Sequence, residues 1–158
     1  MRILGIDPGY ERLGIAIVEK NTSGKEIVVF SECFKTNPKL SFEERVFLIG
    51  ERVVEIIEKF KPKVLSIETL FLTSNHKTVM RVSETRGVII YEAKKAGLKI
   101  FEVSPPEIKT AVAGYGKADK KQVMKMVKLL VKIENSKTSD DELDAIAIAL
   151  TALAVLHF

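Results

Sequence analysis

The first 18 residues, MRILGIDPGYERLGIAIV, contain two short apolar segments separated by a turn. Residues 3–6 are apolar or small, and they run into Asp-Pro-Gly at 7–9, a sequence typical of a turn. Residues 13–18 resume with β-branched and small side chains, which favour a strand. We therefore expect the two segments to pair as a β-hairpin, with Asp7 at the end of the first strand.

Further along the chain, short apolar runs alternate with segments of helical periodicity. Helix starts are predicted after Ser41, Ser104, Asp119 and Ser139, because each is followed three residues later by Glu or Gln, the pattern of a capping box. We expect strands at 27–34, 64–68 and 98–103, and helices at 42–60, 76–96 (capped by Asn75), 105–113, 120–130 and 140–156. This order predicts an α/β fold, with a mixed sheet covered by helices on both faces.

Length and composition indicate one domain over residues 1–158. Apolar residues make up 46% of the chain and charged residues 29%, a balance that excludes a disordered protein. The longest uncharged run, residues 145–158, is too short to cross a bilayer, and the first residues do not resemble a secretion signal. A single cysteine, Cys33, rules out an internal disulfide and fits a reducing compartment. We expect a cytoplasmic protein without a membrane partner.

Charge is unevenly distributed although the net charge is only +4. Residues 107–132 hold seven lysines against Glu107 and Asp119, whereas residues 133–158 hold one lysine against five acids. A basic surface beside an acidic cluster is typical of a polyanion-binding surface next to a metal or catalytic site. A solvated helix face followed by a capped helix start explains the same charges.

Four acids are candidate functional residues because of their positions in the predicted elements. Asp7 and Glu68 close two strands, and ligands bind at strand ends in α/β sheets. A turn aspartate and a solvated strand end are the structural alternatives. Asp141 and Asp144 lie on one stripe of the last helix, which is apolar from Ala145 onward. Acids in the first turn complement the helix dipole, but Asp144 lies beyond it and needs a partner to enter a core.

The sequence near Asp144 offers no basic side chain as that partner, so we expect a divalent cation shared by the four acids. Hard oxygen donors without cysteine or paired histidines favour Mg²⁺, with Mn²⁺ as a substitute, over zinc. Two such ions about 4 Å apart can activate a water and stabilise the leaving oxygen of a phosphodiester. The prediction is a metal-dependent nuclease.

A set of motifs in order along the chain resembles the RuvC family of Holliday-junction resolvases. The motifs are RILGIDPG at 2–9, IETLF at 67–71, Asn75, Arg86-Gly87, VAGYG at 112–116, Lys120 with Gln122-Val123, and DELDAIAIA at 141–149. The resemblance extends from residue 1 to about residue 151. Three positions depart from the usual pattern: Leu13 replaces threonine, Thr69 replaces glutamine, and Asp141 stands where some members have histidine.

The resemblance implies an RNase H-like fold with a five-stranded mixed sheet, and it assigns Asp7, Glu68, Asp141 and Asp144 as catalytic metal ligands. It further implies a homodimer that introduces symmetric nicks into four-way DNA junctions in recombination and repair, leaving 5′-phosphate and 3′-hydroxyl ends. The expected partners are the RuvA junction-binding protein and the RuvB motor. The helix at 76–96 is the candidate dimer interface, with Ile89 and Ala93 among positions that fit either an interface or a core.

Several residues are expected to contact DNA. Lys109 and Lys120 match lysines that the family uses in cleavage or DNA binding, and Phe71 matches an aromatic residue that stacks on an unpaired base. Lys117 and Lys120 flank the glycine-containing loop at 114–116, from which they can reach the acids. Lys121 adds positive charge for phosphate binding, on a stripe that simple solvation also explains.

Two other functions fit the same residues. One is an RNase H-like nuclease that acts on RNA or hybrids, as in the related YqgF proteins. The other is a nucleic-acid-binding module without catalysis, which the four intact acids disfavour. Comparing cleavage of junction, duplex, hybrid and single-stranded substrates in Mg²⁺ separates the three.

Overall fold

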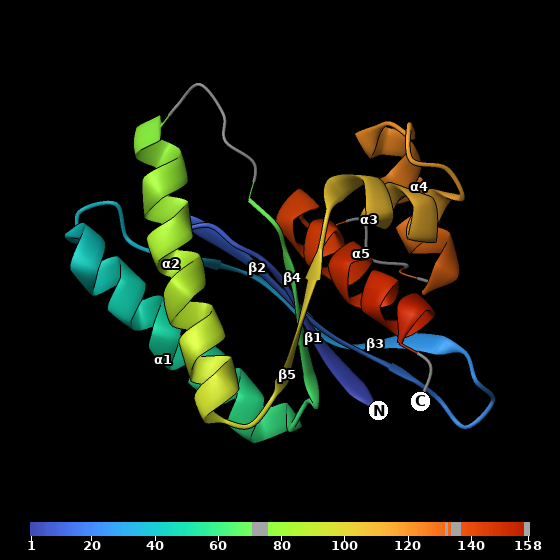
Figure 1. Cartoon of the computed structure of the whole chain (residues 1–158), viewed down its shortest axis with the longest axis horizontal. Coiled ribbons are helices and arrows are strands. Elements are labelled where there is room, and N and C mark those ends of the chain that lie inside the picture. Colours follow the sequence, from blue (N-terminus) through green and yellow to red (C-terminus); the bar gives the residue numbers. More distant parts are fainter. Residues whose placement is uncertain (71–75, 132, 134–136, 157–158) are drawn as a thin grey trace.

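The computed structural model describes residues 1–70, 76–131, 133 and 137–156, and in that part of the chain it contains five strands and five helices (Figure 1). The strands are β1 (Arg2–Asp7), β2 (Arg12–Lys20), β3 (Glu26–Lys35), β4 (Val64–Glu68) and β5 (Lys99–Val103). The helices are α1 (Phe42–Phe60), α2 (His76–Lys95), α3 (Pro105–Ala113), α4 (Lys120–Leu130) and α5 (Asp140–Val155). All the expected elements are present, and their ends differ from the predicted ones by at most two residues.

The strands form one mixed sheet in the order β3-β2-β1-β4-β5. The pairs β1–β2 and β2–β3 are antiparallel, which confirms the predicted hairpin and the third strand beside it. The pairs β1–β4 and β4–β5 are parallel, because helices α1 and α2 provide the crossover connections that parallel strands require. The carboxyl ends of β1 and β4 therefore meet at the same edge of the sheet.

Helices cover both faces of the sheet, as predicted (Figure 1). Helices α1 and α2 pack on one face, and α3, α4 and α5 on the other. Successive residues of β1 alternate between the two cores: Ile3 packs toward α5, whereas Leu4 and Ile6 pack toward α1. Among the described residues, no helix is both long and apolar enough to cross a bilayer.

The helix starts follow the local signals in the sequence. The capping boxes predicted at Ser41, Ser104, Asp119 and Ser139 are present. At α5, the Ser139 hydroxyl accepts a hydrogen bond from the Glu142 amide at 3.3 Å, and the Glu142 carboxylate accepts one from the Ser139 amide at 3.1 Å. The predicted cap Asn75 lies outside the described residues.

Helix α5 approaches β1 and β2 closely where the strands carry glycine. A Cβ atom at Gly5 would overlap the main-chain oxygen of Ala145 and approach the Ala149 side chain to 2.8 Å. The Ser66 hydroxyl on β4 donates to the main-chain oxygen of Ile148 at 2.9 Å. Small residues in the sheet therefore allow the backbone of α5 to approach the central strands directly.

We predict that Gly5→Ala destabilises the fold by about 1–3 kcal/mol, because the added methyl group collides with main-chain atoms that cannot rotate away. Gly116→Ala is the control, since its nearest neighbour is the Thr110 hydroxyl at 3.3 Å, on a side chain that can move. Urea unfolding of both variants measures the difference. Equal stability of the two variants would contradict the close contact at Gly5.

Candidate active site

The sheet brings Asp7 and Glu68 to neighbouring strand ends. Asp7 is the last residue of β1 and Glu68 the last of β4, and the residues before them, Ile6 and Ile67, are paired in the parallel ladder. Side chains alternate along a strand, and Ile6 and Ile67 belong to the core beneath α1 and α2. Asp7 and Glu68 therefore project from the opposite face, where α5 lies.

Helix α5 places two further acids over that edge. Asp141 is in its first turn, and Asp144 comes one turn later, just before the buried residue Ala145. The approach again depends on a glycine, because a Cβ atom at Gly14 of β2 would overlap the main-chain oxygen of Asp141 and lie 3.1 Å from the Asp7 Cβ. Gly14 therefore lies between Asp7 and the start of α5, in a space that has no room for a side chain.

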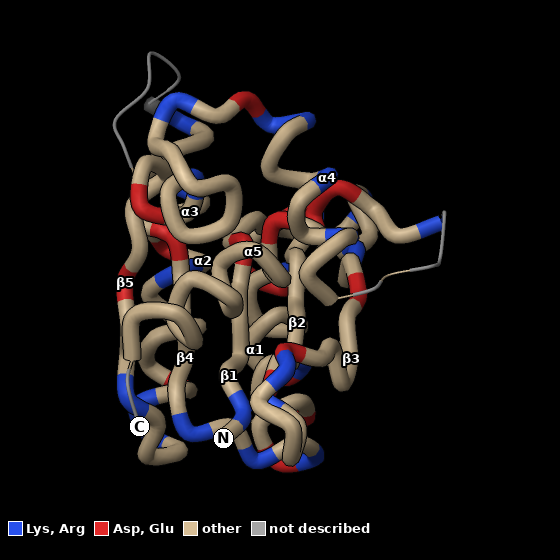
Figure 2. The backbone as a smooth tube through the Cα atoms, turned by 90° about the vertical axis from the view of Figure 1, so that its right-hand side faces the viewer, with Lys and Arg blue, Asp and Glu red and all other residues tan. Residues whose placement is uncertain are grey.

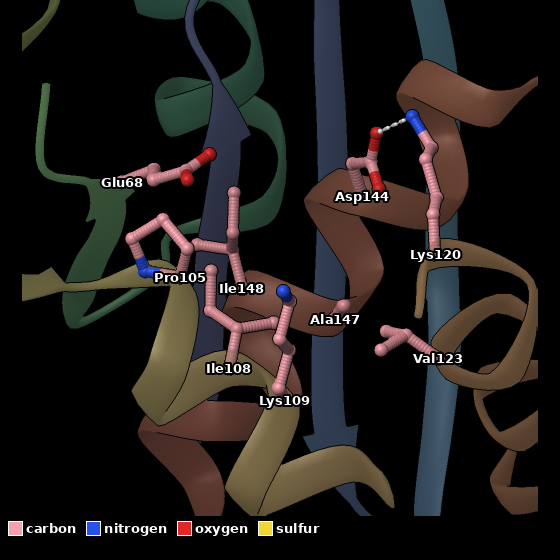
Figure 3. A pocket seen from close by; sticks show the side chains of 9 residues that line it. All are labelled: Glu68, Pro105, Ile108, Lys109, Lys120, Val123, Asp144, Ala147 and Ile148. Carbon is pink, nitrogen blue, oxygen red and sulfur yellow. Dashed lines mark hydrogen bonds and ion pairs between the residues drawn. The ribbon is translucent and has the colours of Figure 1, made fainter. Parts of the chain in front are cut away.

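A pocket of about 250 Å³ opens beside these acids, between β4, α3, α4 and α5 (Figure 3). Its polar residues are Glu68, Asp144, Lys109 and Lys120. Its apolar wall consists of Pro105, Ile108, Val123, Ala147 and Ile148. Two carboxylates and two ammonium groups from four different elements therefore share one cavity.

Two of the acids are paired with basic side chains of the chain itself. Lys120 Nζ lies 2.8 Å from the Asp144 carboxylate, the interaction drawn as a dashed line in Figure 3. Arg12 Nε donates to Asp141 Oδ2 at 2.9 Å, its Nη2 forms an ion pair with the same oxygen, and the Cys33 thiol lies 3.5 Å away. The expectation that no protein cation serves Asp144 is therefore wrong. Its partner is distant in sequence and reaches it only through the packing of α4 on α5.

The ionisation of the acids reflects these partners. Burial raises the pKa of Asp7 to about 7, and repulsion from Asp144, Glu68 and Asp141 adds to the shift. Burial and the charge of Asp144 also raise the pKa of Glu68. Burial acts in the same direction on Asp141, but hydrogen bonds from Arg12 and Cys33 outweigh it and lower its pKa. Negative charge is thus least compensated at the strand ends.

The donor set suits a hard divalent cation, because it consists of carboxylate oxygens whose mutual repulsion a cation would relieve. As the side chains stand, no three acid, imidazole or thiol groups in the described segments are arranged to hold one ion. Asp141 and Asp144 bind Arg12 and Lys120 instead. A cation shared by the four acids would have to compete with these two basic side chains.

The residues predicted to contact DNA are placed differently from one another. Lys109 and Lys120 line the pocket, and in Figure 3 the Lys120 ammonium group points to Asp144. Lys117 and Lys121 are exposed and are not among the residues that line it. Phe71 lies outside the described residues. Acidic and basic positions lie close together near the start of α4, at the top of Figure 2.

Arg12 was not identified from the sequence as part of the site. It is the first residue of β2, opposite Lys35 of β3, and its partner Asp141 lies 129 positions away. The only local signal is its place just after the turn that follows Asp7. An arginine at that position is equally expected at a solvated strand end, so its position does not identify it as a site residue.

Comparisons with known proteins agree with this geometry. Residues 3–152 match the family described as crossover junction endodeoxyribonuclease RuvC. The chain belongs to the RuvC family. A RuvC from Thermosipho melanesiensis is 39% identical over 150 residues, covering 94% of each chain, and one from Caldanaerobacter subterraneus is 37% identical over 150 residues, covering 95% of this chain and 90% of the relative.

Comparison with solved structures supports the same assignment to the RuvC family. A structure of Thermus thermophilus RuvC in complex with a Holliday junction substrate superposes with a TM-score of 0.87 and 28% identity, over 98% of this chain and 94% of that chain. The expected RNase H-like fold of a RuvC nuclease is thereby confirmed. The sequence-based assignment to the RuvC family is confirmed as well.

We predict that Asp7→Asn stabilises the metal-free protein at pH 8 by about 2–4 kcal/mol, because the folded state otherwise carries an acid whose pKa lies near 7 instead of 3.8. Between these two pH values the folded protein retains a proton that the unfolded chain has released. Wild-type stability therefore falls as pH rises through this range, and the gain from Asp7→Asn is smaller at pH 5.

Urea unfolding at pH 5 and pH 8 in a chelator measures this gain. The control is Asp140→Asn, since Asp140 is an exposed acid at the start of the same helix. A gain for Asp7→Asn that does not change with pH would show that Asp7 keeps an ordinary pKa.

Proposed function

We propose that the protein resolves four-way (Holliday) DNA junctions by paired, symmetric nicks that depend on Mg²⁺ and leave 5′-phosphate and 3′-hydroxyl ends. The observation that carries this proposal is the meeting of Asp7, Glu68 and the two α5 aspartates at one edge of the sheet, beside a pocket containing Lys109 and Lys120. Membership of the RuvC family and the structural match to a RuvC bound to a junction supply the substrate class.

Asp7, Glu68, Asp141 and Asp144 would hold the metal, as two Mg²⁺ ions or two Mn²⁺ ions. When bound, these ions lower the pKa of an attacking water and neutralise charge on the leaving oxygen. Asp7 and Glu68 are fixed by the strands, so they provide the rigid half of the site. Their raised pKa values mean that cation binding also favours loss of a proton from Asp7 near neutral pH.

The lysines of the pocket would contact the DNA backbone. Lys120 pairs with Asp144 in the free protein, and this bond raises the pKa of the ammonium group, so the lysine stays charged. If Asp144 were to hold a cation instead of Lys120, the Lys120 ammonium would be available to bind a phosphate oxygen. Lys109 lines the same pocket from α3 and can bind a second phosphate. Phe71 remains a proposed DNA contact on the family resemblance, Lys117 on its place beside the loop at 114–116, and Lys121 on its positive charge.

We also propose that the active form is a homodimer, since a twofold dimer presents two equivalent sites to a substrate of twofold symmetry. The surface proposed for this contact is the groove between α1 and α2, which contains Phe47, Gly50 and Val88. Phe47, Met80 and Tyr91 on these helices are 64%, 64% and 63% exposed. Ile89 and Ala93 are fully buried in the core of the chain and are not available to a second copy.

By the same family resemblance, the RuvA junction-binding protein and the RuvB motor are the proposed partners. They would act on the junction that this nuclease cuts.

We predict that the wild-type protein nicks a synthetic four-way junction in Mg²⁺, and that Asp144→Asn abolishes nicking while junction binding survives. The reason is that the substitution removes a metal-ligand charge without removing a DNA contact. Gel assays should compare the junction with linear duplex, RNA–DNA hybrid and single strand. Preferred cleavage of the hybrid would favour an RNA-directed nuclease, and binding without cleavage of any substrate would favour a binding module.

A supercoiled plasmid with an extruded cruciform tests the paired nicks. Two nicks made within the lifetime of one complex linearise the plasmid, whereas unpaired nicks give open circles. Accumulation of open circles at saturating protein would contradict the proposed dimer.

We predict that Lys120→Ala lowers the single-turnover nicking rate at least 10-fold, because the phosphate contact lies beside the reacting acids. Lys121→Ala is the matched control, since it removes the same charge one residue away and outside the pocket. Rates at saturating protein and binding constants at equal ionic strength should be measured for both. Equal losses in the two variants would reduce Lys120 to a general contributor of positive charge.

A further inference from the structure

Arg86 joins three elements at the end of β4, although it lies on α2, in the helix layer opposite the pocket. Its Nε donates to the main-chain oxygen of Glu68 at 3.0 Å. Its Nη2 forms an ion pair with the carboxylate of Glu102, on β5. The Arg86 side chain is only 16% exposed, whereas that of Glu102 is 52% exposed. A largely enclosed guanidinium therefore connects α2 to the residue that carries a site carboxylate.

The end of β4 is held by strand pairing on one side only. The ladder between β1 and β4 ends at the pair Ile6 and Ile67, one residue before Glu68. On the other side, Glu68 pairs with Val103 of β5, and the Thr69 amide donates to the Val103 oxygen at 2.8 Å. The Arg86 contact thus restrains the Glu68 main-chain oxygen from the α2 side, in addition to the pairing with β5.

The contact uses properties specific to arginine. A guanidinium is planar and presents several donors in a fixed arrangement, so one group can bind a main-chain oxygen and a carboxylate together. A lysine carries a single ammonium on a flexible stem and does not impose the same arrangement. The hydrogen bond from a charged donor to a half-buried carbonyl is also stronger than one from a neutral donor.

We propose that Arg86 is a positioning residue, which fixes the backbone of Glu68 so that its carboxylate faces the acids of α5. This inference rests on the proposed function, because it assigns Glu68 to the metal site. The side chain of Arg86 touches no reacting atom. It acts on the main chain of Glu68, and its contribution is the placement of one metal-ligating carboxylate relative to the other three.

Arg86→Ala should lower the single-turnover nicking rate by roughly 10- to 100-fold, the usual effect of removing a group that orients a metal ligand. Junction affinity should stay within about 2-fold, because Arg86 makes no proposed DNA contact. A misplaced ligand weakens metal binding without abolishing it, so raised Mg²⁺ should restore much of the rate. Arg86→Lys should fall between Arg86→Ala and the wild type.

Two control variants separate positioning from stability. Arg52→Ala removes another partly buried helix arginine, which binds Glu32 of β3 at 2.6 and 2.8 Å and makes no contact with the site acids. Glu102→Gln weakens the ion pair but leaves the hydrogen bond to Glu68. We expect both variants to nick at close to the wild-type rate after correction for any unfolded fraction.

The rise in Tm on adding Mg²⁺ provides a readout that does not depend on cleavage. This rise should be smaller in Arg86→Ala than in the wild type and in Arg52→Ala. A wild-type rise in Arg86→Ala, or an activity loss that only tracks its fall in stability, overturns the inference. If the wild-type protein binds Mg²⁺ but cuts no junction, the proposed function fails, and the Tm comparison still decides the role of Arg86.

Discussion

Helix α5 approaches the central strands so closely that its main-chain oxygens occupy the space that side chains at Gly5 and Gly14 would need. This contact sets the position of the helix start relative to the ends of β1 and β4. Asp141 and Asp144 consequently stand over the edge that carries Asp7 and Glu68. A thicker layer of side chains between helix and sheet would move the two pairs of acids apart. The short distance between α5 and the sheet therefore determines how close the four acids lie to one another.

The four acids repel one another, and basic side chains of the protein neutralise only two of them. Arg12 and Lys120 form ion pairs with Asp141 and Asp144, the two site acids on α5, and both basic residues come from other elements. Asp7 and Glu68 have no comparable ion pair among the described residues, and their pKa values are raised. The free protein thus combines a neutralised helix start with strand ends that favour an added cation. Such imbalance is typical of sites that bind a charged ligand and then act on it.

The sequence predicted the elements well because their signals are local. The helix starts at Ser41 and Ser139 are specified within four residues, and the turn at residues 7–9 defines the hairpin. The acids were identifiable because strand ends and a helical stripe are visible in the pattern of apolar residues. The sequence indicated that Lys120 could reach the acids, but not that it pairs with Asp144, and it gave no sign of Arg12. Both ion pairs exist only after α5 has packed against β2 and α4. The Arg86 contact likewise depends on how α2 crosses the sheet.

The order of the elements along the polypeptide has a consequence for biosynthesis. The strands that carry Asp7 and Glu68 leave the ribosome before α5, which follows all the other described elements. A nascent chain can therefore assemble the hairpin and much of the sheet while its acidic site is still half complete. Docking of the last helix brings Asp141 and Asp144 to this edge and covers the apolar face of the sheet on that side. A chain that stops before α5 therefore lacks two of the four acids of the proposed metal site.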